Sequence, residues 1–217
     1  MGAESVIKVS REKKQGYVTY DELYSEHTDA RVIINTTPCG MFPNINSTAI
    51  DINKLPQAEA VFDAVYNPLK SQLVLQAREK GIVAVGGLYM LVAQAAYAVE
   101  KFIGSPVDVN KTERIFKDLY KNKMNIVLIG MPGCGKSTVG KQISKKLGRE
   151  FVDLDTVITE KAGMPIPEIF AKYGETYFRD LETKVTTEVT KRSSLVIATG
   201  GGCVLREENR RMLRQNS

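Results

Sequence analysis

A chain of 217 residues with 43% hydrophobic and 25% charged residues has the composition of an ordinary globular protein. No apolar run approaches the roughly 20 residues that cross a bilayer, and the start lacks a basic segment followed by an apolar one, so we expect neither membrane insertion nor a signal peptide. Three widely spaced cysteines without a CxxC pair argue against a disulfide framework or zinc site and predict free thiols in a cytoplasmic protein.

The formal charge of +5 is confined to one part of the chain. Residues 1–122 carry 14 Lys/Arg and 14 Asp/Glu, whereas residues 123–217 carry 16 and 11, so the difference of five is the whole excess. These basic residues are scattered, with no long run and no RNA-binding aromatic signature, so we expect no nucleic-acid partner. A small polyanionic ligand accounts for the bias more simply.

Strands alternate with helices along the first hundred residues, and we assign residues 1–104 to one unit. Expected strands lie at Val6–Val9, Arg31–Asn35 and Glu59–Tyr66. Expected helices cover residues 20–26, 70–80 and 88–103. This alternation predicts a partial Rossmann-like α/β unit with a parallel sheet covered on both faces.

A break at Gly104–Pro106 separates a second α/β unit from the first. Residues 105–123 are charged and weakly amphipathic, and we interpret them as a linker helix. In the second unit, residues 124–217, we expect strands at 125–129, 151–154 and 195–198, and helices at 136–147, about 165–191 and from Glu207. Three strands are few for such a sheet and no closing strand follows, so we expect a truncated unit.

The second unit contains the segment Gly130-Met-Pro-Gly-Cys-Gly-Lys-Ser137, which matches the phosphate-loop pattern G-x-x-x-x-G-K-[ST]. An apolar strand precedes it and a helix follows, as such a loop requires. Its glycines let successive N–H groups converge on an anion at a helix N-terminus. Lys136 can reach the β- and γ-phosphates, and the Ser137 hydroxyl can ligate Mg²⁺. The pattern therefore predicts a bound nucleotide but does not specify the reaction.

Two carboxylates, Asp153 and Asp155, lie two residues apart at an expected strand end. In an extended strand they would point to the same face, toward the crevice beyond the carboxyl edge of the sheet. One could serve a metal ion, and the other could orient or deprotonate an acceptor hydroxyl. An exposed acidic pair without a chemical role is the alternative.

Two further motifs fit a substrate site. Arg179 follows two aromatic residues and has Glu182 three positions on, on the same helical face. A guanidinium held by a carboxylate can bind a substrate carboxylate bidentately, although a surface arginine is the alternative. Gly200–Gly202 follow an apolar strand, where glycine lets the backbone approach a ligand closely.

These four motifs occur in one order, in which residues 124–217 resemble shikimate kinase, a P-loop enzyme similar to nucleoside monophosphate kinases. The resemblance implies ATP-dependent phosphorylation of the 3-hydroxyl of shikimate, in the chorismate route to aromatic amino acids. It implies that Asp155, Arg179 and Gly201 bind shikimate, with Asp155 as the base and Arg179 on the carboxylate. It also implies Mg²⁺ at Ser137 and Asp153, catalysis assisted by Lys136, and ATP contacts from Gly133, Cys134, Gly135, Lys136, Ser137 and Thr138.

The family continues into a mobile lid with a catalytic arginine, a further substrate arginine and an adenine loop, none of which we find here. Arginines in that role contribute about 10³–10⁵ in rate, so we expect activity impaired by truncation. A non-catalytic fragment that only binds nucleotide is an alternative.

Motifs at Asn35–Met41, Phe62–Asn67 and Gly87–Ala96 give residues 1–104 a second resemblance. They resemble the C-terminal, NADP-binding half of shikimate 5-dehydrogenase. The resemblance implies NADP contacts from Arg11, Ala64 and Gly87, and shikimate contacts from Tyr66 and Gln94. The family's glycine fingerprint and catalytic domain would precede residue 1, so we expect at most vestigial NADP binding and no hydride transfer.

We therefore interpret the chain as a fusion fragment, in which the C-terminal part of a dehydrogenase precedes the N-terminal part of a kinase. The NADP-dependent dehydrogenase portion of a bifunctional protein is the alternative function. The oligomeric state stays open.

Overall fold

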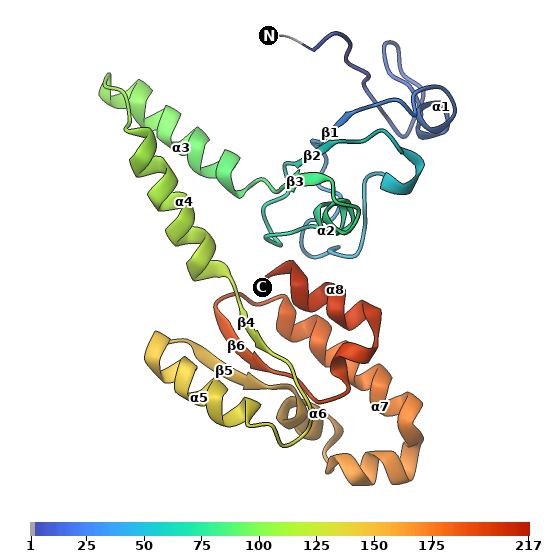
Figure 1. Cartoon of the computed structure of the whole chain (residues 1–217), viewed down its shortest axis with the longest axis vertical. Helices are drawn as coiled ribbons and strands as arrows, with labels where there is room; N and C mark the ends of the chain where they lie inside the picture. Colours follow the sequence, from blue (N-terminus) through green and yellow to red (C-terminus); the bar gives the residue numbers. More distant parts are fainter. Residues whose placement is uncertain (1–2) are drawn as a thin grey trace.

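Two parallel sheets of three strands organise the chain, and a helical hairpin connects them (Figure 1). The computed structural model describes residues 3–217. The fold is therefore α/β with parallel sheets, as the alternation of elements predicts. The first unit consists of α1 (Tyr20–Glu26), β1 (Val32–Asn35), the short 3-10 helix η1 (Ile52–Lys54), β2 (Ala60–Asp63), α2 (Gln72–Glu79) and β3 (Val83–Val85).

Burial alternates along the strands of the first sheet, whose order is β1-β2-β3. Ile33 pairs with Val61, and Val61 with Ala84, and all three pack into one core with side chains of α2. The expectation that both faces are covered is wrong for the described residues. The other face exposes the side chains of Val32, Ile34, Phe62, Val83 and Val85. It stays exposed because α3 runs away from the sheet instead of folding back over it (Figure 1).

Two strand predictions in this unit need correction, and one strand was not predicted. Val6–Val9 is no strand: Val9 makes an isolated parallel bridge with Val18, and Val6 is 75% exposed. The predicted strand Glu59–Tyr66 ends early, at Asp63, where β2 gives way to a turn. Strand β3 was missed because it is only three residues long. The available signal was the apolar, β-branched run Ile82-Val-Ala-Val85 after Gly81.

The hairpin between the units consists of α3 (Leu88–Ile103) and α4 (Val109–Lys123). Helix α3 has the predicted bounds and ends at Gly104, whose left-handed conformation (φ 71°, ψ 17°) suits glycine. Helix α4 begins after Asp108, whose side chain accepts a hydrogen bond from the N–H of Asn110. Tyr89 of α3 and Phe116 of α4 meet edge to face with ring centroids 5.3 Å apart, which joins the two helices.

The second sheet has the order β4-β6-β5, so β6 is central and all four of its residues are buried. Ile197 of β6 pairs with Val127 and Val152 of its neighbours and packs against Val185 of α7 and Leu213 of α8. The elements of this unit are β4 (Ile126–Leu128), α5 (Lys136–Leu147), β5 (Glu150–Asp153), α6 (Leu154–Ala162), α7 (Ile166–Thr190), β6 (Leu195–Ala198), η2 (Cys203–Leu205) and α8 (Glu207–Gln215).

Helix α6 was not predicted, because the acidic motif was interpreted as a continuation of the strand. Strand β5 ends at Asp153, whose side chain accepts a hydrogen bond from the N–H of Asp155 and so caps α6. Helix α7 carries non-helical angles at Gly174 (φ 79°, ψ 175°), which divide it into two helical segments. The second segment begins at Glu175 and presents Arg179.

Candidate active site

The phosphate-loop segment connects β4 to α5 at the carboxyl end of the second sheet. Gly130, Gly133 and Gly135 have φ values of 152°, 75° and 85°, a region that residues with a Cβ rarely adopt. Helix α5 begins at Lys136 without a side-chain cap, so the first-turn N–H groups lack intrahelical partners. Such a helix N-terminus after a glycine loop favours anions, phosphate above all.

Lys136 lies against its own loop. Its ammonium donates to the carbonyl oxygens of Gly130 (2.9 Å) and Met131 (2.8 Å) and lies 3.8 Å from the Cys134 Sγ. These weakly basic acceptors are ones that phosphate oxygens could replace. Cys134 is exposed, and so is Thr138 in the first turn of α5.

The predicted metal pair is brought together. The Ser137 hydroxyl donates to Asp153 Oδ2 at 2.5 Å, while Asp153 Oδ1 accepts from the N–H of Asp155 at 3.1 Å. A hydroxyl and a carboxylate side by side form the oxygen donor set that Mg²⁺ prefers, so the residues fit this ion. The two aspartates are neighbours because Asp153 caps the helix that carries Asp155. The predicted extended geometry is therefore wrong.

Asp155 lies half-buried in the first turn of α6. Burial raises the pKa of its carboxyl group, and the neighbouring Asp153 raises it further, whereas Lys136 and Arg179 act in the opposite direction. A carboxylate with a raised pKa in a partly buried site is suited to accept a proton.

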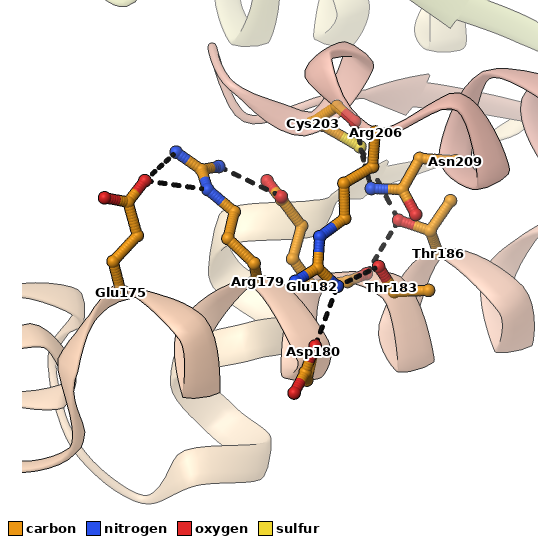
Figure 2. A network of polar contacts seen from close by, with 9 residues as sticks. All are labelled: Glu175, Arg179, Asp180, Glu182, Thr183, Thr186, Cys203, Arg206 and Asn209. Atoms are coloured by element: carbon orange, nitrogen blue, oxygen red, sulfur yellow. Dashed lines mark hydrogen bonds and ion pairs between the residues drawn. The ribbon is translucent and has the colours of Figure 1, made fainter.

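Arg179 is held by two carboxylates of α7 (Figure 2). Its Nη1 donates to Glu182 Oε2 at 3.0 Å, and its Nε and Nη2 lie 3.3 Å from Glu175 Oε1. The Glu182 side chain is only 1% exposed, and burial raises the pKa of this carboxyl group. Burial alone would lower the pKa of Arg179, but the hydrogen bonds to Glu182 and Glu175 raise it. The guanidinium is therefore fixed in direction and 19% exposed.

The triglycine turn, Gly200–Gly202, connects these groups. A Cβ at Gly200 would lie 2.6 Å from Asp155 Oδ1, and one at Gly202 would lie 2.5 Å from Arg179 Nη1. A Cβ at Gly201 would lie 2.6 Å from the ring of Pro132 in the phosphate loop. The turn thus touches three motifs that are far apart in sequence. Pro132 was not among the predicted site residues, and only its place in the phosphate loop could have indicated it.

The five residues assigned to the first unit by resemblance are only partly brought together. Ala64 and Gly87 are in contact, because a Cβ at Gly87 would overlap the Ala64 backbone. Tyr66 is 37% exposed beyond the end of β2. Gln94 is exposed on α3 and Arg11 on the segment before α1. No hydrogen bond joins the five within residues 3–217.

All three cysteines are free. Cys203 is buried beneath the triglycine turn, and burial raises the pKa of its thiol to about 11, so it stays protonated. Among the described residues, no helix combines the length and apolar character needed to cross a membrane.

A strand, a glycine loop, a lysine and a helix on a parallel sheet define a P-loop α/β unit. Residues 132–217 match the family model for shikimate kinase. A curated shikimate kinase from Thermodesulfovibrio yellowstonii is 53% identical over 92 residues, which are 42% of this chain and 53% of that protein.

Two solved structures are similar to parts of this chain. Shikimate kinase from Acinetobacter baumannii, in complex with shikimate, is 46% identical over 46% of this chain and 56% of its own, with a TM-score of 0.44. A chorismate mutase/shikimate 5-dehydrogenase fusion protein from Clostridium acetobutylicum is 32% identical over 52% of this chain and 44% of its own, with a TM-score of 0.47. The chain spans about half the length of the curated relatives it matches.

Proposed function

We propose that residues 124–217 carry a shikimate kinase site, which binds ATP with Mg²⁺ and transfers the γ-phosphoryl group to the 3-hydroxyl of shikimate. The observation that carries the proposal is the triglycine turn. It adjoins the phosphate loop through Pro132, the carboxylate of Asp155 and the guanidinium of Arg179. A phosphate donor and a hydroxyl acceptor bound on the two sides of this turn would be neighbours.

On the donor side, the first-turn N–H groups of α5 would receive the phosphates of ATP. The Lys136 ammonium would exchange the carbonyls of Gly130 and Met131 for phosphate oxygens, which carry more negative charge. Ser137 and Asp153 would hold the Mg²⁺ ion, which supplies charge compensation on the phosphate oxygens. Gly133, Cys134, Gly135 and Thr138 complete the proposed nucleotide contacts.

On the acceptor side, Arg179 would bind the carboxylate of shikimate bidentately, because Glu182 and Glu175 fix its orientation. The backbone at Gly201 would lie against the substrate ring. The 3-hydroxyl oxygen then forms a bond to the γ-phosphorus while the bond to the ADP oxygen breaks. Its proton passes to the Asp155 carboxylate, whose raised pKa suits it to accept a proton.

A second proposal concerns the first unit, residues 1–104. We assign the first unit at most a vestigial NADP site at Ala64 and Gly87 with Arg11, and a shikimate contact at Tyr66 and Gln94. A kinase of a small metabolite with three free thiols fits a cytoplasmic protein. These assignments rest on resemblance and not on a continuous site.

Two ligands and two variants test the proposal by isothermal titration. We expect Lys136→Ala to lose at least about tenfold in affinity for Mg–ADP while shikimate binding is kept. We expect Arg179→Lys, which keeps the charge but not the bidentate geometry, to lose about tenfold for shikimate and to keep Mg–ADP. Failure of the wild type to bind shikimate, or equal losses of both ligands in both variants, would overturn the proposal.

A further inference from the structure

Neighbouring elements of the fold hold the triglycine turn in place. Glycine has the largest conformational freedom of any residue, so three in a row do not fix their own geometry. The N–H groups of Cys203 and Leu205 bond to the carbonyls of Gly200 (3.2 Å) and Gly202 (3.0 Å), so these backbone bonds stay within the turn and η2. The position of the turn against Asp155 and Arg179 must therefore come from neighbouring elements.

Side chains of α8 supply this support. The Asn209 side-chain amide donates to the carbonyl oxygen of Cys203 at 2.9 Å and lies 3.7 Å from its Sγ (Figure 2). Arg210 donates to the next two carbonyls, those of Val204 and Leu205, at 2.7 and 2.9 Å. Three consecutive carbonyls of η2 are thus bonded by two adjacent residues of α8.

Asn209 differs from Arg210 in its burial. Asn209 is 0% exposed, whereas Arg210 is partly exposed. The Asn209 Oδ1 has no hydrogen-bond partner within residues 3–217, and a buried unpaired acceptor costs about 1–3 kcal/mol. A leucine, whose side chain has the same number and branching of heavy atoms, would avoid this cost. The favourable part of the asparagine is therefore its donated hydrogen bond to Cys203.

Helix α7 supports the same turn from its other side. The Thr186 hydroxyl donates to the carbonyl of Glu182 (2.8 Å) and lies 3.6 Å from the Cys203 Sγ. Arg206 reaches Asp180 at 2.8 Å and Thr183 at 3.3 Å (Figure 2). Cys203 therefore lies between Asn209 and the helix that carries Arg179. A change at Asn209 would move the turn relative to that guanidinium.

We propose that Asn209 is a positioning residue of the shikimate site, which acts through the Cys203 carbonyl to hold the triglycine turn against Asp155 and Arg179. The inference rests on the proposed function, because it assigns Asn209 to the shikimate side of that site and not to the nucleotide side. Among the described residues the Asn209 side chain bonds to Cys203 and not to the phosphate loop. The turn meets that loop at the Pro132 ring, and a turn that has lost the support of Asn209 is loosened but not driven into this ring.

Asn209→Leu tests this role, and Asn125→Leu is the matched control. Asn125 is equally buried (3% exposed) and makes two 2.9 Å hydrogen bonds at the opposite end of β6, to Arg192 and Leu195. We expect Asn209→Leu to weaken shikimate binding about tenfold and leave the Mg–ADP affinity unchanged, since misplacement by about 1 Å costs up to ~10²-fold in a site. Asn125→Leu should lower stability but leave both affinities within about twofold.

A second readout separates this inference from the proposed function. Amide hydrogen exchange of Cys203 and Leu205, measured without ligand, should become about tenfold faster in Asn209→Leu than in Asn125→Leu. If Asn209→Leu does not fold, Asn209→Ser should give the same two results. Unchanged exchange, or a shikimate affinity that falls no more than in the control, would overturn the role of Asn209. Faster exchange in a chain whose wild type does not bind shikimate would instead refute the proposed function.

Discussion

The partly buried position of Asp155 affects both its proposed chemistry and the stability of the protein. The partial burial that suits it to accept a proton also makes its charged form unfavourable in the folded protein. Because the folded pKa lies above the unfolded value, the folded state binds more protons just above the usual aspartate range. Its contribution to stability is therefore present at low pH and is lost as the pH rises through the folded pKa.

Asp155→Asn should remove this pH dependence. We expect the free energy of unfolding of the variant minus that of the wild type to increase as the pH rises from about 4 to about 7.5, so that the variant becomes relatively more stable. Urea unfolding of both proteins at several pH values measures the difference. A difference that does not vary with pH, or that varies in the opposite direction, would show that the Asp155 pKa is not raised.

The sequence singles out the residues proposed for the kinase site because each belongs to a local motif with its own spacing. The contacts that bring these residues together could not be predicted from the sequence. Asp153 and Asp155 were predicted to face one way along a strand, and they are neighbours instead through a helix cap. Asn209 has no motif at all, because its role depends on the carbonyl that it meets in the folded chain.

At the scale of elements, the triglycine turn contacts both the phosphate loop and the proposed acceptor site, through adjacent residues. At Gly201 an added methyl group would meet the rigid ring of Pro132, and at Gly200 it would meet the Asp155 carboxylate at 2.6 Å and Glu182 at 3.2 Å. The first contact displaces the phosphate loop, and the second displaces a side chain of the proposed acceptor site.

We therefore expect different effects from two alanine substitutions. Gly201→Ala should weaken both Mg–ADP and shikimate binding about tenfold, because Gly201 meets the phosphate loop and, in the proposed site, the substrate ring. Gly200→Ala should weaken shikimate binding by a similar factor and leave the nucleotide affinity nearly unchanged. Titration of both ligands against both variants checks this, and each variant is the control for the other. An Mg–ADP affinity that falls as far in Gly200→Ala as in Gly201→Ala would contradict this separation.

Elements with clear end signals were predicted with the right bounds. Helix α5 begins after the glycine of the phosphate loop and ends at Gly148, and α3 ends at Gly104. The elements that were missed, β3 and α6, are short, and a neighbouring motif dominated the interpretation of α6. The exposed face of the first sheet could not be predicted, because strand periodicity does not say which helices fold back.

At the scale of the whole molecule, the C-terminal residues connect the two units. Asn216 is buried and accepts from the N–H of Leu69 at 2.9 Å while donating to the carbonyl of Thr190 at 3.0 Å. The Gln215 carbonyl accepts from the N–H of Lys70 at 2.9 Å. Figure 1 shows α8 beside α2 at this junction. These directed hydrogen bonds therefore orient the two units relative to each other.

Asn216→Ala should loosen this junction. The substitution leaves the N–H of Leu69 and the carbonyl of Thr190 without these partners. An unpaired buried group costs about 1–3 kcal/mol, so we expect the free energy of unfolding to fall by at least about 1–3 kcal/mol. Amide exchange at Leu69 should accelerate in the same variant. The control is Arg214→Ala, which removes an exposed ion pair with Glu79 and should cost less than about 1 kcal/mol. Similar effects of the two variants would contradict the role of Asn216.

The central claim, phosphoryl transfer to shikimate, is tested most directly by following radiolabel from the γ-phosphate of ATP. The account predicts a labelled shikimate phosphate whose formation requires this chain, Mg²⁺ and shikimate. It also predicts that Asp155→Asn forms this product at least about 10²-fold more slowly, since a general base contributes about 10²–10⁴. Nucleotide binding by that variant should be kept. Label that never reaches shikimate, or equal transfer by the wild type and Asp155→Asn, would contradict the account.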